Sequence, residues 1–413
     1  MTKVLVIGSG GREHALVWKL SQSDCTIYCA PGNGGISELA QCVPIKADDI
    51  LGLLTFAKQE KIDLTIVGPE VPLGLGIVDE FEKHNLKIFG PNKKAAQLET
   101  SKQFAKNFCR KYNLPTPGFE SFTDSANAKR YIETRRFPIV IKASGLAAGK
   151  GVIIAQNQEQ AFATIDRIIE KKEFGKAGGT IVIEDFISGQ EVSMLAFSDG
   201  NTIIPMIPAR DHKPLLDGNK GPNTGGMGTY APIPELKDPW ITRIQNEIFN
   251  PMTQALKKED IEYKGIIYAG LIMSGDSFSI LEFNCRWGDP EAEVLLPLLK
   301  SDLVSLCYDT IDGKLKQPEW KNEYALTVIA ASGGYPEKYE TGKQIIGNLG
   351  NTENTIVFHC GTKKEDNQYL TTGGRVLAIT GLGKTLAQAK ENSYSAIKKI
   401  NFDKMYYRPD IGK

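Results

Sequence analysis

Strand-like apolar runs alternate with amphipathic helical runs through residues 1–100. Strands are predicted at 4–7, 26–29, 64–67 and 87–89, and helices at 13–21, 50–59 and 76–84. This alternation is typical of parallel strands joined by crossover helices. We therefore predict an open parallel sheet of the Rossmann-like kind. A ligand of such a sheet is expected outside the carboxyl ends of the strands.

Glycine-bearing loops follow four of these strands, at 8–14, 31–35, 68–70 and 90–92. In the first loop, Glu13 stands where a dinucleotide fingerprint has its third glycine, and no acid ends the second strand, so a nicotinamide cofactor is disfavoured. Gly10, Gly11 and the helix that follows are suited to hold a lone phosphate through backbone N–H groups. A plain strand–helix turn explains the same glycines.

The segment 277–293 combines a strand pattern with acidic, amide and basic side chains. Alternation places Glu282 and Asn284 on one strand face, and Arg286 keeps the same parity if the strand continues. A carboxylate and an amide oxygen suit Mg²⁺, which leaves its other positions to water and phosphate. A solvated strand edge followed by a turn at 288–290 explains the same residues, so the remaining chain has to decide.

Two predicted strands, at 138–142 and 152–155, flank a loop of small residues and one lysine. Small residues let backbone N–H groups approach phosphates, and Lys142 and Lys150 can neutralise them. The order of a Walker A loop is missing. We predict a flexible flap over nucleotide phosphates, and the alternative is an ordinary long hairpin.

The remaining patterns predict three domains. Residues 101–120 form a helix capped by Ser101 and then a linker, residues 207–232 are loop-like, and residues 239–258 form a helix. Strands at 265–273 and 277–284 pair, and helices follow at 290–299 and 301–312. Residues from 324 onward contain strands and one helix at about 385–400. The predicted domains are 1–100, 101–323 with a flap subdomain at about 121–190, and 324–413.

Composition excludes several classes of protein. Lys and Arg number 49, as do Asp and Glu, so no net charge attracts nucleic acid or an anionic membrane. The seven cysteines form no C-x-x-C pair, which predicts reduced thiols and a cytoplasmic protein. The chain enters a strand at Lys3, so we expect no signal peptide. No apolar run approaches the roughly 20 residues that span a bilayer.

The order of these motifs resembles that of ATP-grasp ligases, and in detail the glycinamide ribonucleotide synthetase family (phosphoribosylamine–glycine ligases). The similar runs are 8–15, 30–33, 63–70, 87–91, 145–152, 221–228, 282–291, 333–336, 372–376 and 410–412. The resemblance implies an α/β chain with a Rossmann-like pre-ATP-grasp domain, an ATP-grasp fold with a mobile flap, and a small C-terminal α+β domain.

The resemblance also implies a reaction, the second step of de novo purine synthesis. ATP phosphorylates the glycine carboxylate, and the amine of 5-phosphoribosylamine displaces phosphate from glycyl phosphate to give glycinamide ribonucleotide. Mg²⁺, or Mn²⁺ in its place, is the implied cofactor. Small-molecule substrates are the implied partners of a monomer or weak homodimer, with no nucleic acid, no membrane and no fused later purine enzyme.

Each candidate residue receives a role from the same resemblance. The metal ligands are Glu282 and Asn284, and the catalytic residues are Arg286, Lys142 and Asp289. The ATP-binding residues are Lys102, Lys142, Gly145, Ala148, Gly149, Lys150, Gly151, Glu184, Phe186, Ile187 and Glu191. Phosphoribosylamine is assigned to Gly10, Gly11, Asn33 and Glu70. Glycine is assigned to Asp211, Thr224, Gly226 and Met227.

Three residues depart from the family pattern. Ser144, Trp287 and Glu293 stand where the family usually has aspartate, phenylalanine and glutamine. The strand at 268–272 also carries no acid, so a second metal ion lacks a ligand there. Two other functions were weighed, a carboxylase or formate-using ligase of the same superfamily and a non-catalytic nucleotide sensor. The runs 10–14 and 221–228 disfavour the first, and the retained Lys142, Glu282, Asn284 and Arg286 disfavour the second.

Overall fold

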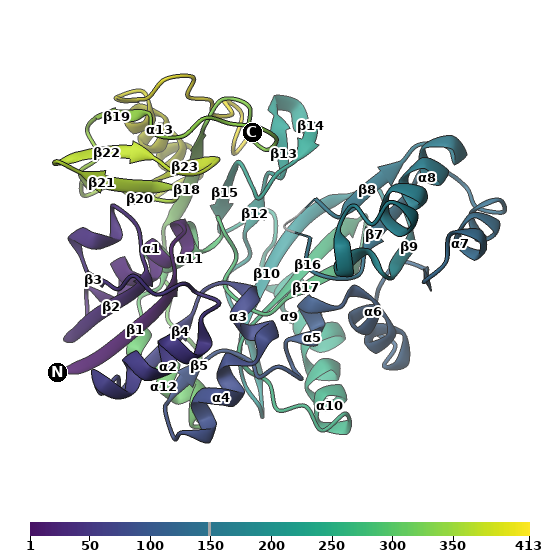
Figure 1. The fold of residues 1–413 in the computed structure, drawn as a ribbon, viewed down its shortest axis with the longest axis horizontal. Coiled ribbons are helices and arrows are strands. Elements are labelled where there is room, and N and C mark those ends of the chain that lie inside the picture. Colours follow the sequence, from purple (N-terminus) through teal and green to yellow (C-terminus); the bar gives the residue numbers. More distant parts are fainter. Residues whose placement is uncertain (148–149) are drawn as a thin grey trace.

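The structure is a computed structural model that describes residues 1–147 and 150–413. The N-terminal elements lie beside the C-terminal elements, and a lobe that carries β7 (Ile139–Ala143), β8 (Val152–Ala155) and β9 (Ile181–Asp185) projects to the other side (Figure 1). The strands β10 (Gln190–Asp199), β16 (Lys264–Ser274) and β17 (Ser277–Asn284) run between these parts. The described helices include none that is both long and apolar enough to cross a membrane.

The N-terminal part is a parallel sheet, as predicted, and it has five strands, one more than the four predicted. Its strands are β1 (Thr2–Gly8), β2 (Cys25–Pro31), β3 (Gln41–Cys42), β4 (Leu64–Val67) and β5 (Ile88–Phe89), in the order β3-β2-β1-β4-β5. The helices are α1 (Gly11–Leu20), α2 (Ile50–Gln59), α3 (Glu70–Leu75) and α4 (Ile77–Lys83), of which α3 was not predicted. The strand order reverses between β1 and β4, so the loops after these strands flank the crevice where such sheets bind ligands.

The middle of the chain forms two antiparallel sheets. The projecting lobe has the order β6-β9-β7-β8, from β6 (Phe119–Phe122), β7 (Ile139–Ala143), β8 (Val152–Ala155) and β9 (Ile181–Asp185), with helices α7 (Ser125–Ile132) and α8 (Gln158–Ile165). The second sheet has the order β11-β10-β16-β17, from β10 (Gln190–Asp199), β11 (Ile203–Pro205), β16 (Lys264–Ser274) and β17 (Ser277–Asn284).

Helices flank these sheets, and all of them except the short helix at 97–100 lie where helices were predicted. They are α5 (Gln97–Thr100), α6 (Lys102–Lys111), α9 (Asp238–Ile244), α10 (Asn250–Lys258), α11 (Ala292–Leu298) and α12 (Leu303–Ile311). Ser101 caps α6, since its side chain accepts from the backbone N–H of Phe104. A wider helical turn at 245–249 joins α9 to α10, so the single helix predicted there is confirmed.

The prediction of a loop at 207–232 is wrong. This segment contains β12 (Arg210–Asp211), β13 (Pro214–Leu216), β14 (Lys220–Asn223) and β15 (Gly228–Ala231). The strands have only two to four residues each, which is too few to show a clear periodic pattern. β15 pairs with β18 (Tyr324–Ala331), a partner distant in sequence, and this pairing brings β12 and β15 into the C-terminal sheet.

The C-terminal part is antiparallel and carries one long helix, which confirms the predicted α+β class. Its main sheet has the order β12-β15-β18-β23-β20, completed by β20 (Thr355–His359) and β23 (Arg375–Gly383), and α13 (Leu386–Ile397) packs against it. A smaller sheet contains β19 (Gln344–Gly347), β21 (Thr362–Glu365), β22 (Gln368–Thr371) and β24 (Ile400–Asn401). The predicted domain boundaries stay predictions.

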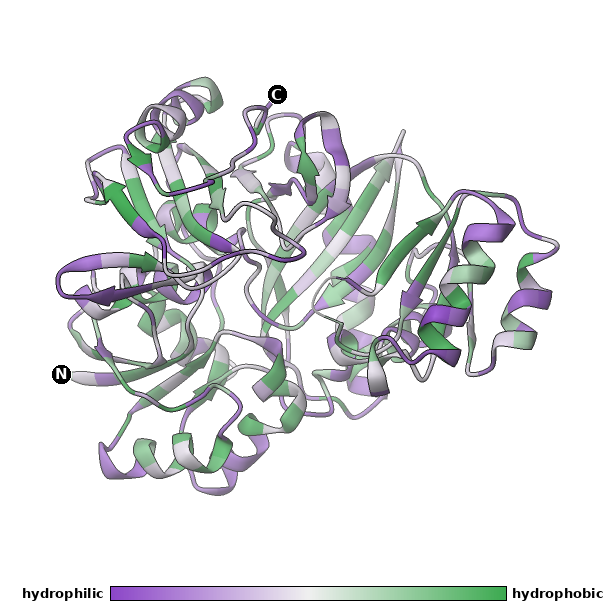
Figure 2. Ribbon diagram, turned by 45° about the horizontal axis from the view of Figure 1, so that its top comes forward, coloured by the Kyte–Doolittle hydropathy of each residue, from purple (hydrophilic) through white to green (hydrophobic). Residues whose placement is uncertain are grey.

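Apolar residues concentrate on the strands of each part (Figure 2). In β1, Val4, Leu5, Val6 and Ile7 are all fully buried, as expected for a parallel strand covered on both faces. The strands therefore carry much of the buried core, and the polar residues discussed below come from strands, helices and loops.

Candidate active site

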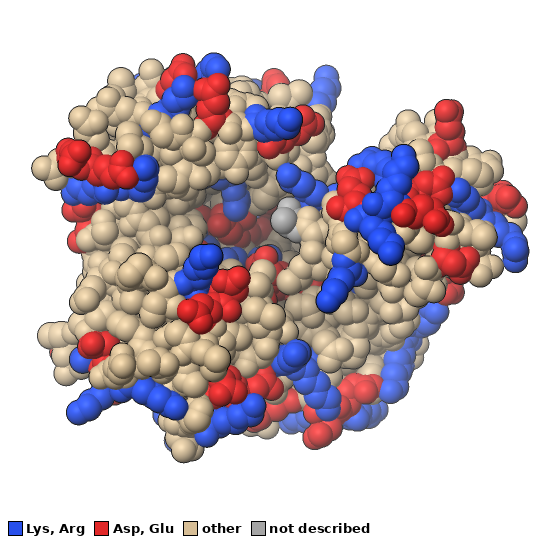
Figure 3. Space-filling model, viewed as in Figure 1, with Lys and Arg blue, Asp and Glu red and all other residues tan. Residues whose placement is uncertain are grey.

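A cleft of about 490 Å³ opens where the three parts of the chain meet. Figure 3 shows acidic and basic side chains gathered in this hollow. Its lining includes Glu70 from α3 of the N-terminal part, Lys142 from β7, Glu282 from β17 and Arg375 from β23. Charged groups from distant segments therefore face one space.

A β-bulge in β17 turns Glu282 and Asn284 toward this cleft. In the pairing with β16, Gly270 lies opposite Glu282 and Leu271 lies opposite Ile280, which leaves Leu281 as the extra residue. Before the bulge the even-numbered residues Phe278 and Ile280 are buried. After it the odd-numbered Phe283 is buried, so the face of the strand that packs into the core changes at Leu281. Without the bulge, Glu282 would share the face of the buried Ile280.

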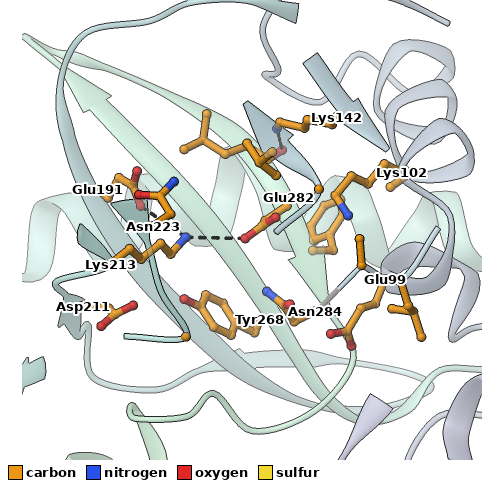
Figure 4. Close-up of a pocket in the computed structure, with 18 of the residues that line it drawn as sticks. Glu99, Lys102, Lys142, Glu191, Asp211, Lys213, Asn223, Tyr268, Glu282 and Asn284 are labelled. Carbon is orange, nitrogen blue, oxygen red and sulfur yellow. Dashed lines mark hydrogen bonds and ion pairs between the residues drawn. The ribbon is translucent and has the colours of Figure 1, made fainter. Parts of the chain in front are cut away.

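Lysines surround the carboxylate of Glu282 (Figure 4). The ammonium of Lys213 lies 3.5 Å from Glu282 Oε1 and 3.2 Å from Glu191 Oε2. Burial alone would raise the pKa of Glu282, but Lys213, Lys102 and Lys142 outweigh it and lower this pKa to about 2. Glu282 is therefore ionised at neutral pH, and it stands among three ammonium groups.

Lys142 is held in place from two directions. Its ammonium lies 2.9 Å from Glu184 Oε1 and donates to the backbone oxygen of Leu281 at 2.9 Å. Lys106 pairs with the other oxygen of Glu184 at 2.9 Å. No hydrogen bond to the ammonium of Lys102 occurs within the described residues, so this cation remains available to an anion.

Arg286 lies between two carboxylates at the inner end of the cleft. Its guanidinium contacts Glu70 Oε2 at 3.3 Å, Glu99 Oε1 at 2.8 Å and Asn284 Oδ1 at 3.1 Å. Glu99 also accepts from the backbone N–H of Cys285 at 2.7 Å. Sequence reasoning missed Glu99, because nothing in the short helix α5 distinguishes it from a solvated surface acid.

A second acidic group lies beside Tyr268. Glu291 Oε1 accepts from Ser193 Oγ and from Tyr268 Oη, each at 2.8 Å, and Asp211 lines the cleft beside it. Burial and the neighbouring Glu291 raise the pKa of Asp211 well above its usual value. Two carboxyl groups in a buried space disfavour each other's charge, so a bound cation would relieve the repulsion.

Arg375 brings the C-terminal part into the site. Its Nη1 donates to the backbone oxygens of Gly225 at 2.6 Å and Asp289 at 2.9 Å, and its Nη2 lies 2.9 Å from Asp289 Oδ1. Gly226 adopts φ +113°, and a Cβ there would lie 2.7 Å from Asp211 Oδ1, so only glycine fits. The 224–227 turn is therefore fixed against Asp211 and Asp289.

Two residues predicted for glycine binding are engaged within the protein. Thr224 Oγ1 donates to the backbone oxygen of Lys213 at 2.7 Å and accepts from the backbone N–H of Gly226 at 3.0 Å. Met227 is fully buried and is not part of the cleft lining. Their predicted contacts with glycine stay predictions, and Asp211 is the member of this set with a carboxylate facing the cleft.

The side chain of Glu13 fills the glycine loop after β1, so this loop does not form an open cradle for a phosphate. Glu13 Oε2 accepts from the backbone N–H of Gly10 at 2.6 Å, and Arg12 Nε lies 2.6 Å from Glu13 Oε1. A Cβ at Gly8 or Gly68 would collide with this carboxylate. One backbone donor of the predicted phosphate site is therefore already used, while Arg12 and Glu70 line the cleft beside it.

The amide of Asn33 joins the N-terminal and C-terminal parts. Its Nδ2 donates to the backbone oxygens of Ser9 at 2.9 Å and His359 at 2.8 Å, and its Oδ1 accepts from the backbone N–H groups of Gly35 and Ile36 at 2.9 Å. Asn33 is not among the residues that line the cleft. Its predicted contact with phosphoribosylamine stays a prediction.

Apolar side chains line the end of the cleft between the two middle sheets. Val140, Val152, Ile154, Phe186 and Ile187 belong to this lining. Leu146, Ala147 and Gly151 of the predicted flap also face the cleft, whereas Gly145 and Lys150 are not in the lining. The predicted ATP-binding residues Ala148 and Gly149 lie outside the described residues.

Comparison with known proteins agrees with this geometry. Three family profiles match the chain: the N domain of phosphoribosylglycinamide synthetase at residues 2–99, its ATP-grasp (A) domain at 100–292 and its C domain at 325–413. The curated phosphoribosylamine–glycine ligase of Halalkalibacterium halodurans is 48% identical over 411 residues, which cover 99% of this chain and 96% of the relative. The chain belongs to the phosphoribosylglycinamide synthetase family.

Further comparisons include other phosphoribosylamine–glycine ligases and a more distant protein that shares only the fold. The phosphoribosylamine–glycine ligase of Salmonella typhimurium is 46% identical over 99% of this chain and 98% of its own length. The crystal structure of the Thermotoga maritima ligase superposes with a TM-score of 0.88 at 32% identity and covers both chains fully. A biotin carboxylase domain from Hydrogenobacter thermophilus has a TM-score of 0.78 at 15% identity, covering 98% of this chain and 91% of that one, which shows a shared fold alone.

Two of the three departures from the family pattern have a clear structural effect. Ser144 Oγ accepts from the backbone N–H of Gln103 at 3.1 Å, so its hydroxyl supplies an acceptor at the start of α6. Glu293 is fully buried, and burial raises its pKa well above the usual value. A protonated Glu293 is close in charge and shape to the glutamine that the family usually has. The rings of Trp287 and Phe197 lie nearly perpendicular within a hydrophobic core, with 5.6 Å between their centroids.

The donor set fits a metal ion that takes most of its ligands from phosphate and water. Within residues 1–147 and 150–413, no cluster of three or more His, Cys, Asp or Glu residues is placed to hold a metal ion. Glu282 and Asn284 offer one ionised carboxylate and one amide oxygen, a combination that suits Mg²⁺. The register places Gly270 opposite Glu282, so β16 supplies no carboxylate at this level.

Proposed function

We propose that the chain ligates glycine to 5-phosphoribosylamine at the expense of ATP, with glycyl phosphate as the intermediate. The products are glycinamide ribonucleotide, ADP and phosphate. The supporting observation is the cleft itself, in which Lys102, Lys142 and Lys213 gather around one ionised carboxylate, Glu282, and Arg286 lines the same space. Family membership and the printed names of the curated relatives support the choice of substrates.

ATP is proposed to bind with its adenine between Val140 and Ile154, against the backbone of 184–187. Lys102 and Lys142 would then neutralise its phosphates, and Glu191 would accept from the ribose hydroxyls. Phosphoryl transfer is catalysed mainly by positioned cations, because negative charge is spread over the transferred group. Mg²⁺ or Mn²⁺ bound by Glu282 and Asn284 would supply further positive charge at the β- and γ-phosphates.

Glycine is proposed to bind between Arg286 and the acidic pair Asp211 and Glu291. The carboxylate of glycine is the group that accepts the phosphoryl, so it belongs near Arg286 and the γ-phosphate. The ammonium of glycine carries the opposite charge and suits Asp211 and Glu291. The amine of phosphoribosylamine then attacks the acyl phosphate from the side of Glu70, Gly10 and Gly11, while the 145–152 flap excludes water from the acyl phosphate.

An Asp211→Asn variant tests the assignment of glycine. The substitution removes one of the two charges proposed for the glycine ammonium and keeps the size of the side chain. We expect the KM for glycine to rise by about tenfold or more, with the KM for ATP little changed, since a charge-assisted hydrogen bond contributes roughly 1.5–3 kcal/mol. An equal rise in both KM values would contradict the assignment.

The proposed reaction is tested by ADP release. Protein, Mg-ATP, glycine and freshly generated 5-phosphoribosylamine are mixed, and each acceptor is omitted in turn. We expect full ADP release only when glycine and the amine are both present. Release that ignores either acceptor would contradict the proposed function, and ATP binding without any turnover would indicate a nucleotide sensor.

We further propose that the protein acts in the cytoplasm as a monomer or weak homodimer. All seven cysteines are free in the structure, which is typical of a reducing compartment. The charge balance argues against nucleic acid or membrane partners. Sedimentation at several protein concentrations would measure the oligomeric state.

A further inference from the structure

Lys106 is a buried lysine that the reaction proposed above does not use. It lies on α6, four residues after Lys102, and its side chain is 4% exposed. Its ammonium contacts three oxygens: Glu184 Oε2 at 2.9 Å, Thr116 Oγ1 at 2.7 Å and the backbone oxygen of Ile280 at 3.2 Å. An ammonium group has three protons, so these partners use its full donor capacity. Lys106 therefore has no donor left for a phosphate.

The partners of Lys106 surround the bulge of β17. The backbone oxygen of Ile280 accepts from Lys106 and also from Thr116 Oγ1 at 2.9 Å. The backbone N–H of Ile280 donates to the backbone oxygen of Pro115 at 2.7 Å. The backbone oxygen of the extra residue Leu281 accepts from the ammonium of Lys142. The partner residue in each of these hydrogen bonds lies outside the β16–β17 strand pair. All of the bonds are made at the bulge, where the regular hydrogen bonding between the two strands is interrupted.

The bulge decides which way Glu282 and Asn284 face. A one-residue change of parity in a strand sends each later side chain to the opposite face. An extended β17 without the bulge would direct Glu282 toward the core that holds Ile280, where an ionised carboxylate is strongly disfavoured. Holding the bulge therefore holds the proposed metal and phosphate face of the strand.

We propose that Lys106 is a positioning residue for phosphoryl transfer, which acts by clamping the Ile280–Leu281 bulge and so fixing Glu282 and Asn284 on the cleft face. Glu184 connects this clamp to Lys142, so the same network orients a proposed phosphate ligand and the metal face together. The inference rests on the proposed function for its meaning in catalysis. The structural part of the inference is that Lys106 keeps Glu282 and Asn284 turned toward the cleft, and this part can be tested without measuring turnover.

The test is ADP binding with and without Mg²⁺, measured by calorimetry on the whole protein. Lys106→Met keeps the length of the side chain and removes all three donors. We expect metal-free ADP to bind with nearly unchanged affinity, while the strengthening of ADP binding by Mg²⁺ falls by about tenfold to a hundredfold, the usual cost of losing support behind a metal ligand. In turnover, kcat falls and the KM for glycine changes little.

A matched control comes from the same helix. Lys111 is an exposed lysine of α6 that pairs with Glu259 at 2.5 Å on the surface. Lys111→Met makes the same chemical change outside the clamp, and it should keep the full Mg²⁺ effect. Lys106→Arg, which restores a cation with several donors, should recover part of the effect.

Two results would overturn the inference. The first is an unchanged Mg²⁺ effect in Lys106→Met. The second is an equal loss of metal-free and metal-bound affinity, which would make Lys106 a direct nucleotide contact. If Lys106→Met does not fold, Thr116→Val removes one donor to Ile280 and carries the test, with a smaller loss of the same kind expected and no loss contradicting the clamp. Wild-type protein that fails to release ADP with both acceptors would contradict the proposed function instead, and the ADP titrations would still judge the clamp.

Discussion

Replacing Glu282 by Gln is expected to remove most of the turnover and leave the fold intact. Glu282 is the anion that Lys102, Lys142 and Lys213 surround, and it is the proposed carboxylate ligand of Mg²⁺. Glutamine has the same shape but no charge, so the three ammonium groups lose their shared counterion and the metal loses its charged ligand. We expect kcat to fall by on the order of a hundredfold to a thousandfold, which corresponds to roughly 3–4 kcal/mol of transition-state stabilisation.

Steady-state ADP release, with the melting temperature measured alongside, checks this expectation. Glu319→Gln provides a matched control, because Glu319 is an exposed acid that pairs with Lys300 on the surface. The control should keep full activity. Near-normal turnover in Glu282→Gln would remove Glu282 from the metal site, whereas a large fall in melting temperature would show that its charge mainly stabilises the fold.

The fold was largely predictable because its signals are local. The buried run of β1 and the helices α1, α2 and α4 follow from hydrophobic periodicity, and the β16–β17 hairpin follows from two strands around a turn at Gly275. The strands at 210–231 were missed for the opposite reason. They have only two to four residues each, and β15 exists as a strand because β18 supplies its partner from another part of the chain.

The site was predictable where residues lie close in sequence. Glu282 and Asn284 do line the cleft together, as alternation predicted, but the bulge at Leu281 turns them there, and strand alternation alone gives no sign of it. Arg286 also lines the cleft, although β17 ends at Asn284 and strand parity no longer applies.

The site residues that the sequence did not predict were missed for a common reason. Glu99, Lys213 and Arg375 come from three separate parts of the chain and meet their partners only through the tertiary fold. Arg375 is the clearest case, because its contacts with Gly225 and Asp289 join β23 to loops far away in sequence. A single sequence does not contain the distances on which such contacts depend.

Acid is expected to destabilise the protein through histidines at the contact between its N-terminal and C-terminal parts. His14 Nδ1 accepts from the backbone N–H of His359 at 2.7 Å, and His359 Nδ1 lies 3.0 Å from Thr362 Oγ1. Burial, followed by the charge of the neighbouring His359, lowers the pKa of His14 to about 3. Burial likewise lowers the pKa of His359 to about 4.

The direction of the effect follows from proton linkage. Above pH 6.5 both rings are neutral in the folded and the unfolded chain, so they add no pH dependence. As the pH falls from 6.5 toward 4, the unfolded chain binds protons that the folded chain does not, and the free energy of unfolding decreases. Each histidine costs about 1.4 kcal/mol of unfolding free energy for every pH unit below its unfolded pKa of about 6.5. At pH 5 each histidine therefore lowers the free energy of unfolding by about 2 kcal/mol.

Variants separate this effect from that of other groups. Asp211 and Glu293 have raised pKa values, so they bind protons first in the folded state and oppose the loss on acidification. Comparing wild type with His14→Asn cancels their contribution, because asparagine offers an oxygen acceptor near the Nδ1 position but does not titrate.

Urea unfolding at pH 7.5 and pH 5 makes the comparison. We expect the loss of unfolding free energy between the two pH values to be smaller by about 2 kcal/mol in His14→Asn and by about 4 kcal/mol in the double variant with His359→Asn. His84→Asn, at a half-exposed surface position beside Glu80, should behave as wild type. Equal losses in all four proteins would show that both rings already carry their protons in the folded state, and that the contact between the two parts of the chain tolerates charge.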